Sequence, residues 1–232
     1  MSEVSRLPLG LSQPFECSYR PEKKEQLLIV QSKMNPGHFE GLMSLGFRRS
    51  GSDVYRPHCP ECRSCEPVRV LVKEFVPSRS QRRILAKNRD LTWRVVSQPT
   101  DEHRALYHRY IRGRHSDGPM YPPTDEQFNR FLPCDWLEQR YLEGRLDGKL
   151  VLVAVTDRLS QALSAVYTFF EPELDKRSLG VCGILKQLEY AKSEGKHFLY
   201  LGYQIEECRK MAYKTQYRPY QTLTTGGWHT LA

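Results

Sequence analysis

The pattern of hydrophobic and polar residues predicts a mixed α+β chain. Short apolar stretches at Leu27–Val30, Thr92–Val96 and Ala162–Phe170 have the length of strands. From Pro67 to Phe75, valines alternate with other residues at the period of two that a half-buried strand requires. Residues 47–55 form a further strand ribbon in this interpretation.

Helices are predicted where a capping residue precedes an apolar periodic stretch. Asn35 and Ser78 can each cap a helix, and these helices run to about residues 45 and 87. Pro36 supports the first of them, because proline is tolerated at the first helical position. Thr124 can cap a short helix that ends near Leu132.

A longer helix is predicted from Asp101 to His115. Leu106, Tyr110 and Ile111 share one face of this helix, so that face should pack against the protein core. His103 and Arg104 fall on the other face and are expected to point outward.

The second half of the chain predicts a hairpin. Asp147-Gly148 is a typical tight-turn sequence between strands expected at 138–146 and 149–156. Residues 157–161 are expected to turn again into the next strand. This order of elements is that of an antiparallel meander.

A helix and a strand follow the meander. The helix is predicted from Gly183 to Ser193, and the strand from His197 to Leu201. A strand–helix–strand unit crosses over to a parallel neighbour and needs a covered sheet face. The fold class is therefore α/β or α+β.

The predicted division is an N-terminal domain at 1–97, which carries the cysteines, and a second domain at 98–232. The boundary lies between residues 97 and 125. The segment HSDGPMYPP at 115–123 cannot form regular structure, so we interpret it as a hinge or active-site loop.

Composition adds a preference for polyanionic partners. The chain has 232 residues, 39% of them hydrophobic, with a net charge of +8. That charge favours nucleic acid as a partner, with a generally basic surface as the alternative. No apolar stretch is long enough for a transmembrane helix, and the N-terminus lacks the pattern of a signal peptide, so we expect a cytoplasmic protein without a membrane partner.

The cysteines suggest a metal site. Cys59, Cys62 and Cys65 are closely spaced, and Cys17 or His58 could supply a fourth ligand to zinc. An iron–sulfur cluster would suit the same thiols. The alternative is that they only pack or form hydrogen bonds. The remaining cysteines are interpreted as buried structural residues.

Basic residues at helical spacing follow the cysteines. Arg79, Arg82, Arg83 and Lys87 share a helix on which several of them face the same way. They could contact nucleic-acid phosphates or bind a small carboxylate. A solvated basic helix is the alternative.

Aromatic and basic residues alternate again near the C-terminus, between Leu199 and Pro219. Such residues can stack on bases and pair with phosphates. They can equally belong to a helix end whose lysines lie along an apolar surface. The residues concerned are Tyr200, Tyr203, Tyr213, Tyr217, Arg209, Lys210 and Lys214.

Several enzyme signatures are missing from the sequence. It has no Ser-His-Asp order, no Walker loop and no dinucleotide glycine fingerprint. The turn at 179–183 could bind an anion through exposed backbone amides, but this signal is weak.

Six segments, taken together and in order, resemble the bacterial aminoacyl-tRNA–protein transferases. The similarity is greatest to the aspartate/glutamate leucyltransferases, which are related to the eukaryotic arginyl-tRNA–protein transferases. It extends over nearly the whole chain. The segments are HCPECRSCEPVRV, FVPSRSQRRILAKNRDL, YHRY to RHSDGPM, LSAVYTFFEP, RSLG and YLGYQIEECRKMAYK.

This resemblance implies a fold and a reaction. The C-terminal domain should have an acetyltransferase-like fold. The enzyme should transfer leucine from leucyl-tRNA to the N-terminal Asp or Glu of a protein, which creates a degradation signal of the N-degron pathway. Since the ester is already activated, the chemistry itself requires no cofactor.

This reaction also suggests candidate site residues. The acidic side chain of the acceptor needs a cationic partner, and our hypothesis assigns that role to basic residues of the helix at 79–87 or to Lys210 and Lys214. The catalytic candidates are Tyr203, Lys210, Tyr213 and Lys214. The substrate-binding candidates are Arg79, Arg82, Arg83, Lys87, Asn88, His115 and Asp117.

Other functions remain open at this point. An arginyl-tRNA–protein transferase would differ only in the amino acid carried. An acyl-CoA N-acetyltransferase would share the fold, although the turn at 179–183 is a weak pyrophosphate site. A zinc-ribbon nucleic-acid-binding protein would bind zinc and form no peptide product.

Overall fold

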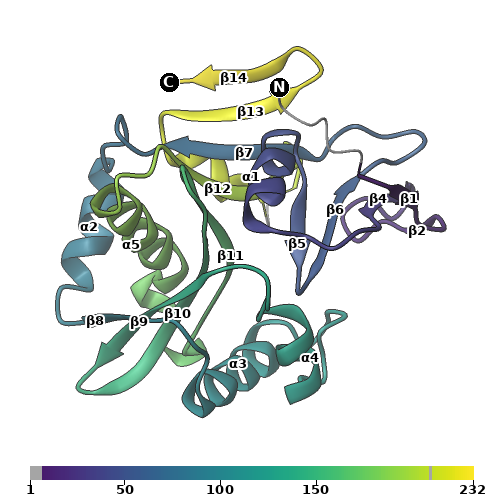
Figure 1. Cartoon of the computed structure of the whole chain (residues 1–232). Helices are drawn as coiled ribbons and strands as arrows, with labels where there is room; N and C mark the ends of the chain where they lie inside the picture. Colours follow the sequence, from purple (N-terminus) through teal and green to yellow (C-terminus); the bar gives the residue numbers. More distant parts are fainter. Residues whose placement is uncertain (1–6, 209–210) are drawn as a thin grey trace.

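The computed structural model describes residues 7–208 and 211–232, and an eight-stranded sheet dominates it (Figure 1). The strand order is β14-β13-β7-β12-β11-β10-β9-β8. All pairs are antiparallel except β11 with β12, which are parallel. The strands are β7 (Glu66–Leu71), β8 (Thr92–Val96), β9 (Gln139–Leu146), β10 (Lys149–Arg158), β11 (Ala162–Phe170), β12 (Phe198–Gln204), β13 (Tyr220–Thr224) and β14 (Gly227–Leu231).

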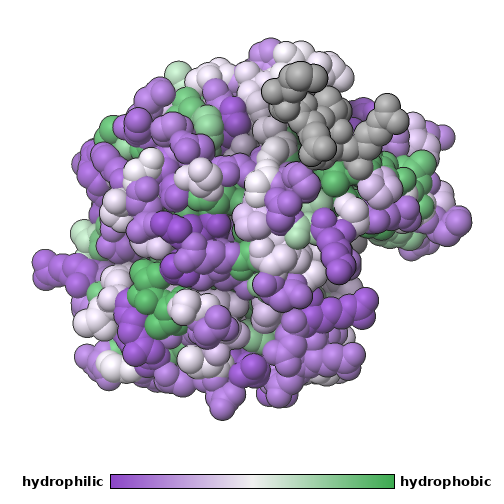
Figure 2. Space-filling view, viewed as in Figure 1, coloured by the Kyte–Doolittle hydropathy of each residue, from purple (hydrophilic) through white to green (hydrophobic). Residues whose placement is uncertain are grey.

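A smaller sheet is formed near the N-terminus, in the order β1-β4-β6-β5. Hydrophobic residues show on the surface of this part in Figure 2, and Leu9, Leu11 and Phe15 are among the exposed ones. The strands are β1 (Leu9–Leu11), β4 (Leu27–Val30), β5 (Arg48–Ser50) and β6 (Asp53–Pro57), with a separate pair, β2 (Phe15–Glu16) and β3 (Lys24–Glu25).

The helices that precede β9 begin where the sequence predicts. Asn35, Ser78 and Thr124 each accept a hydrogen bond from a backbone amide in the first helical turn, and Thr100 does the same for the longest helix before β9. The helices are α1 (Pro36–Ser44), α2 (Arg79–Lys87), α3 (Asp101–Arg114), α4 (Asp125–Phe131) and α5 (Leu179–Ser193), with 3₁₀ turns η1 (Pro172–Arg177) and η2 (Ala212–Gln216). Every one of them is too short or too polar to span a lipid bilayer in the described part of the chain.

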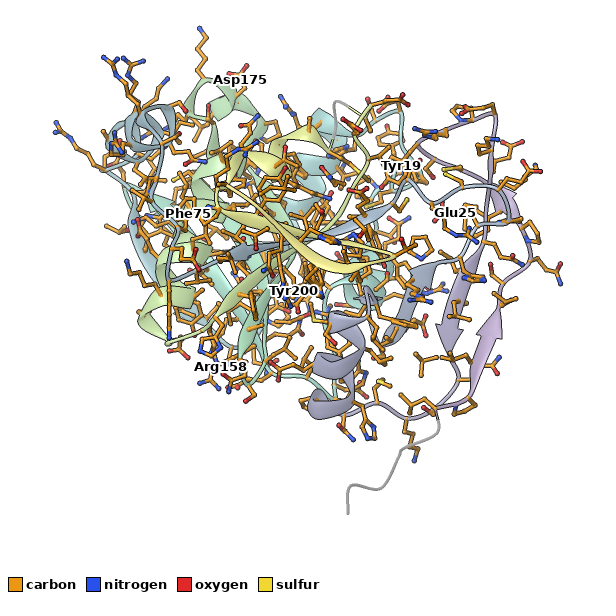
Figure 3. The ribbon with its side chains drawn as sticks, turned by 90° about the horizontal axis from the view of Figure 1, so that it is seen from above. Tyr19, Glu25, Phe75, Arg158, Asp175 and Tyr200 are labelled. Carbon is orange, nitrogen blue, oxygen red and sulfur yellow. The ribbon has the colours of Figure 1, made fainter. Side chains whose placement is uncertain are left out.

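The two faces of the main sheet are covered by different elements. Leu199 and Leu201 of β12 pack in a core that contains α5, and Leu85 of α2 packs against that core. Tyr200, between those two leucines, packs instead with α1 and the small sheet. Since successive strand residues point to opposite faces, α2 and α5 lie on one side of the sheet at β12, and α1 with the small sheet lies on the other. Figure 3 shows Tyr200 beneath the β13–β14 hairpin.

Helix α5 connects the parallel strands β11 and β12, as the predicted crossover requires. It begins four residues earlier than predicted. Gly180 and Gly183 lie inside this helix and let it approach the strands closely. A Cβ at these positions would lie 3.3 Å from the ring of Phe170 and 3.1 Å from Thr168.

The main sheet contains strands from both sides of the predicted domain boundary. β7 and β8 precede residue 98, yet β7 pairs with β12 and β13 in the centre of the sheet. That the chain divides into two domains at a boundary between residues 97 and 125 stays a prediction.

A buried ion pair joins the small sheet to the main sheet. Arg49 of β5 donates two hydrogen bonds to the carboxylate of Asp157 on β10, at 2.8 and 2.5 Å. The same guanidinium donates to the carbonyl oxygens of Gly51 and Leu132. This pair also corrects a prediction, since residues 157–161 were expected to turn and β10 instead runs through Arg158. A strand can hold the polar Asp157 because its charge is paired inside the protein.

His103 is a second correction. It was expected on the outer face of its helix, but it is fully buried. Its ring lies 2.8 Å from the carboxylate of Glu143, which is also buried. The same ring accepts a hydrogen bond from the backbone amide of Thr100. Burial lowers the pKa of His103. Helical periodicity alone could not predict this partner on a neighbouring strand.

Candidate active site

The strands β11 and β12 separate partway along their length. They pair only from Ala162 to Ser164 on β11 and from Phe198 to Tyr200 on β12, although both strands continue beyond. A cavity lies at this point, between the two strands and the small sheet. We refer to it as the wedge cavity. Its lining includes Ser164 and Val166 of β11, Gly202 and Tyr203 of β12, and Arg48 of β5.

Gly202 shapes the entrance to the wedge cavity. The pairing of β12 with β7 shifts register between Tyr200 and Gly202, and Gly202 has a φ of +78°. A left-handed backbone at this position favours glycine. A Cβ here would lie 3.3 Å from Arg48 Nη1 and 3.8 Å from Lys214 Nζ. The irregularity therefore brings β12 close to two cations.

Lys214, in η2, is buried beside the wedge cavity. Its ammonium donates a hydrogen bond to the carbonyl oxygen of Tyr203. Burial, and then the nearby positive charge of Arg48, lower the pKa of Lys214 to about 8. A substantial fraction of this lysine is therefore neutral near physiological pH.

Tyr203 holds the same region together. Its hydroxyl donates a hydrogen bond of 2.7 Å to the carbonyl oxygen of Gly46, which precedes β5. The Arg48 guanidinium lies 5.8 Å from the centre of the Tyr203 ring. Because its hydroxyl proton is already used, Tyr203 is better suited to position Arg48 and Lys214 than to transfer protons.

Tyr213 extends the site toward α3. Its phenol is within electrostatic range of Arg48 on one side and of Tyr110, Tyr167 and Tyr217 on the other. The rings of Tyr110 and Tyr167 lie 6.2 Å apart. Helix α3, strand β11 and η2 therefore contribute phenols to one aromatic region.

Two of these phenols have unused hydroxyls. The oxygen atoms of Tyr167 and Tyr217 are buried and have no hydrogen-bond partner among the residues that the structure describes. Burial raises the pKa of both, so they stay protonated near neutral pH. Tyr217 is also within electrostatic range of Cys182 in the first turn of α5. Buried polar groups are normally satisfied, so these two hydroxyls are available to bind a polar ligand.

Comparison with known proteins identifies the family. Residues 15–83 match the family model described as arginine-tRNA-protein transferase, N terminus, and residues 102–224 match its C-terminus. The aspartate/glutamate leucyltransferase of Shewanella putrefaciens is 54% identical over 230 residues, which cover 98% of both chains. The corresponding protein of Aeromonas hydrophila is 48% identical and is covered over 98% of its length.

The chain belongs to the aspartate/glutamate leucyltransferases, within the aminoacyl-tRNA–protein transferase family. The resemblance found in the sequence is thereby confirmed. A solved structure supports the mixed α+β fold. It is the C-terminal domain (DUF2156) of a putative lysylphosphatidylglycerol synthetase from Agrobacterium fabrum, with a TM-score of 0.50 and 15% identity, matched over 82% of this chain and 64% of that one.

In this leucyltransferase, the catalytic candidate Tyr203 lines the wedge cavity. The candidates Lys214 and Tyr213 lie next to it, since Lys214 donates to the Tyr203 carbonyl and its ammonium lies 5.8 Å from the centre of the Tyr213 ring. Lys210 lies outside the described residues. His115 and Asp117 are in the irregular segment between α3 and α4. The His115 ring packs against Tyr110 at 5.1 Å, whereas the Asp117 side chain is exposed.

The substrate-binding candidates on α2 lie elsewhere. Arg79, Arg82, Arg83 and Lys87 are all exposed on a helix that packs against α5, on the sheet face opposite the small sheet. Asn88 is buried at the end of α2, where its side chain donates to the carbonyl oxygens of Ile84 and Arg177 and accepts from the Arg177 guanidinium. Asn88 therefore connects α2 to the segment before α5.

The cysteines gather near the small sheet. Burial raises the pKa of Cys65 to about 12, and the thiols of Cys59, Cys17 and Cys62 are close enough to add to this effect. Across residues 7–208 and 211–232, however, no three His, Cys, Asp or Glu side chains are arranged to hold a metal ion. This arrangement does not form a ligand set, so we derive no catalytic step from a metal, and the metal site stays a prediction.

Sequence reasoning missed Arg48 and the phenols of Tyr110 and Tyr167. Arg48 follows Phe47 and precedes Arg49, and nothing local distinguishes the two arginines. The only available signal was the strand ribbon at 47–55, whose alternation places neighbouring arginines on opposite faces. Tyr167 lies in LSAVYTFFEP, one of the segments that carry the family resemblance, but the direction in which its side chain points depends on the sheet.

Proposed function

We propose that this protein transfers leucine from leucyl-tRNA to the N-terminal Asp or Glu of acceptor proteins. The observation that carries the proposal is the full-length relationship to aspartate/glutamate leucyltransferases, at 54% identity over 98% of both chains. The product would carry an N-terminal leucine, which, as the family resemblance implies, is a degradation signal.

The proposed reaction is aminolysis of an ester. The acceptor α-amine attacks the carbonyl carbon of the leucyl ester, so that a C–N bond forms and the C–O bond to the terminal ribose breaks. The amine loses a proton, and the ribose hydroxyl leaves with one. Much of the rate can come from holding amine and ester together.

We place the donor end in the gap where β11 and β12 separate, in an acetyltransferase-like arrangement, the finer fold assignment that we propose here. In this arrangement the terminal ribose and ester of leucyl-tRNA enter between β11 and β12, next to the first turn of α5. The unpartnered hydroxyls of Tyr167 and Tyr217 support this placement, since both are protonated donors in a water-poor region.

Lys214 is suited to the proton transfer. With a pKa of about 8 it is close in basicity to an α-amine, whose reference pKa is about 7.7–8.0. A neutral Lys214 would accept the proton that the acceptor amine loses on attack. Its hydrogen bond to the Tyr203 carbonyl fixes its position beside Gly202.

The exposed arginines of α2 are suited to the tRNA body. They lie on the same side of the sheet as α5, whose first turn borders the proposed donor site. Guanidinium groups on a solvent-facing helix can pair with phosphates without being buried. We therefore assign Arg79, Arg82, Arg83 and Lys87 to tRNA rather than to the acceptor.

Mass spectrometry of model peptides tests the proposal. An Asp-initiated peptide is incubated with the enzyme and a tRNA pool charged either with leucine or with arginine. We expect the peptide to gain the mass of one leucine residue and to gain nothing from the arginine-charged pool. An Ala-initiated peptide serves as the matched control and should remain unmodified.

The alternatives predict different products. Gain of an arginine residue would identify an arginyl-tRNA–protein transferase. An acetylated peptide, formed with acetyl-CoA and without tRNA, would identify an N-acetyltransferase. An unmodified peptide under all conditions, with zinc bound to the protein, would favour the nucleic-acid-binding alternative.

A further inference from the structure

The guanidinium of Arg48 has no counter-ion in the described part of the chain. It lines the wedge cavity together with Arg49 and Asp157. Asp157 is the only carboxylate in that lining among the described residues, and Arg49 binds both of its oxygens. Arg48 itself forms no ion pair and no side-chain hydrogen bond there, although it is half-buried.

Aromatic side chains surround this charge. The phenols of Tyr19, Tyr55, Tyr203 and Tyr213 are all within electrostatic range of Arg48. Figure 3 shows Tyr19 near Glu25 of β3, in the separate strand pair. A cation held in such a site without a carboxylate loses hydration and gains little in return. An anionic ligand that enters the cavity would supply the missing partner.

Two other carboxylates of the region are already engaged. Glu66 accepts a hydrogen bond of 2.8 Å from Gln204, and Glu207 pairs with Arg20 at 2.6 Å. Neither forms an ion pair with Arg48. The protein therefore keeps Arg48 available beside the reacting groups, in contrast to its neighbour Arg49.

We propose that Arg48 binds the side-chain carboxylate of the acceptor's N-terminal Asp or Glu, and thereby determines acceptor specificity. This inference rests on the proposed function. A guanidinium can hold a carboxylate through two parallel hydrogen bonds, which a neutral amide cannot match. Arg48 replaces the α2 arginines as the acceptor clamp, because those are exposed on the opposite side of the sheet.

The spacing of Arg48 and Lys214 suits a terminal residue that carries both a side-chain carboxylate and the reacting α-amine. Arg48 and Lys214 approach the same point of β12, since a Cβ on Gly202 would lie 3.3 Å from one and 3.8 Å from the other. In an N-terminal Asp or Glu, the carboxylate and the α-amine belong to one residue. A carboxylate held by Arg48 would place the amine next to Lys214, which we assign to proton transfer.

Steady-state kinetics with matched peptides tests this inference. The peptides differ only in their first residue, which is Asp, Glu, Asn or Gln, and leucyl-tRNA is kept saturating. In the wild type we expect kcat/KM to be far higher for Asp than for Asn. In Arg48→Met the Asp/Asn ratio should fall by about 30- to 1,000-fold, because one partner of a desolvated charge pair is lost.

The controls separate specificity from general damage. Arg48→Lys keeps the positive charge, so its Asp/Asn ratio of kcat/KM should lie between those of the wild type and Arg48→Met. Arg56→Met removes another arginine of the same ribbon, whose guanidinium donates to the Leu45 carbonyl, and should leave the ratio unchanged.

The outcomes distinguish the two levels of the proposal. If Arg48→Met transfers leucine more slowly but keeps the wild-type Asp/Asn ratio, Arg48 is not the acceptor clamp and the proposed function stands. If the wild type transfers leucine to none of the four peptides, the proposed function itself fails.

Discussion

Lys214 is buried, approaches the same point of β12 as Arg48, and has a pKa near that of the acceptor α-amine. If neutral Lys214 takes up the proton from the attacking amine, kcat/KM requires two deprotonated groups, the lysine and the acceptor amine. Log kcat/KM should then rise with a slope of about two below pH 7, because both pKa values lie near 8. In Lys214→Met the slope should fall to about one, and kcat should drop by about 10²–10⁴-fold. Initial rates between pH 6 and 8 provide the measurement.

Lys196 is the matched control for this prediction. It is also a buried lysine, and its ammonium donates to the carbonyl oxygens of Leu159 and Ser160, in the turn before β11. Lys196→Met should keep the slope of two even if it lowers stability. A slope of two in Lys214→Met would exclude the lysine as the proton acceptor.

The difference between Arg48 and Arg49 explains why single residues were only partly predictable. Aromatic and basic residues near the C-terminus marked Tyr213 and Lys214 as candidates, and these do lie together. Arg48 carried no such signal, since its environment comes from β12 and η2, more than 150 residues later. Composition and spacing report a residue's chemistry, whereas its counter-ions depend on distant strands.

Among whole elements, the local signals were the most informative. Helix α2 begins at the predicted cap because the Ser78 side chain bonds the Gln81 amide, three residues away. Strand β11 likewise has the predicted bounds. The β13–β14 hairpin was missed, although alternating residues around Gly226-Gly227 could have indicated it. Its pairing with β7 joins residues about 150 positions apart, which no local pattern specifies.

Helix α2 leads to a prediction about salt dependence. If its exposed arginines contact tRNA phosphates, each lost contact should reduce the slope of log Kd against log salt by about 0.7–0.9. Arg82→Ala together with Arg83→Ala should therefore weaken leucyl-tRNA binding and flatten its salt response. The Asp/Asn acceptor ratio should stay as in the wild type. Filter binding at several salt concentrations measures the slope.

An exposed arginine on α4 is the control for this experiment. Arg130→Ala removes the same charge from a helix that packs with α3 rather than with α5. It should leave the salt slope unchanged. Equal slopes in the α2 double variant and in Arg130→Ala would exclude α2 from the tRNA contact.

At the scale of the whole molecule, the reacting groups come from parts of the chain that must fold together. Arg48 belongs to the small sheet, Gly202 to the main sheet and Lys214 to η2. Strand β7 lies between β12 and β13, so the first third of the chain is built into the centre of the main sheet. A site assembled in this way requires the small sheet to be held firmly against β10 and β12.

The Arg49–Asp157 pair supplies part of that attachment. Asp157→Asn leaves the Arg49 charge buried without its partner, so we expect the free energy of unfolding to fall by about 3–5 kcal/mol. The double variant Arg49→Met, Asp157→Leu removes both charges, and should recover most of that loss because two apolar side chains can fill the space. Urea unfolding, followed by tryptophan fluorescence and by circular dichroism, measures both values. Since the two sheets are joined by this buried pair and by a common hydrophobic cluster, the two signals should change in one transition. Two separate transitions in the wild type would mean that the small sheet unfolds independently. In that case the position of Arg48 beside Lys214 would depend on docking rather than on a common core.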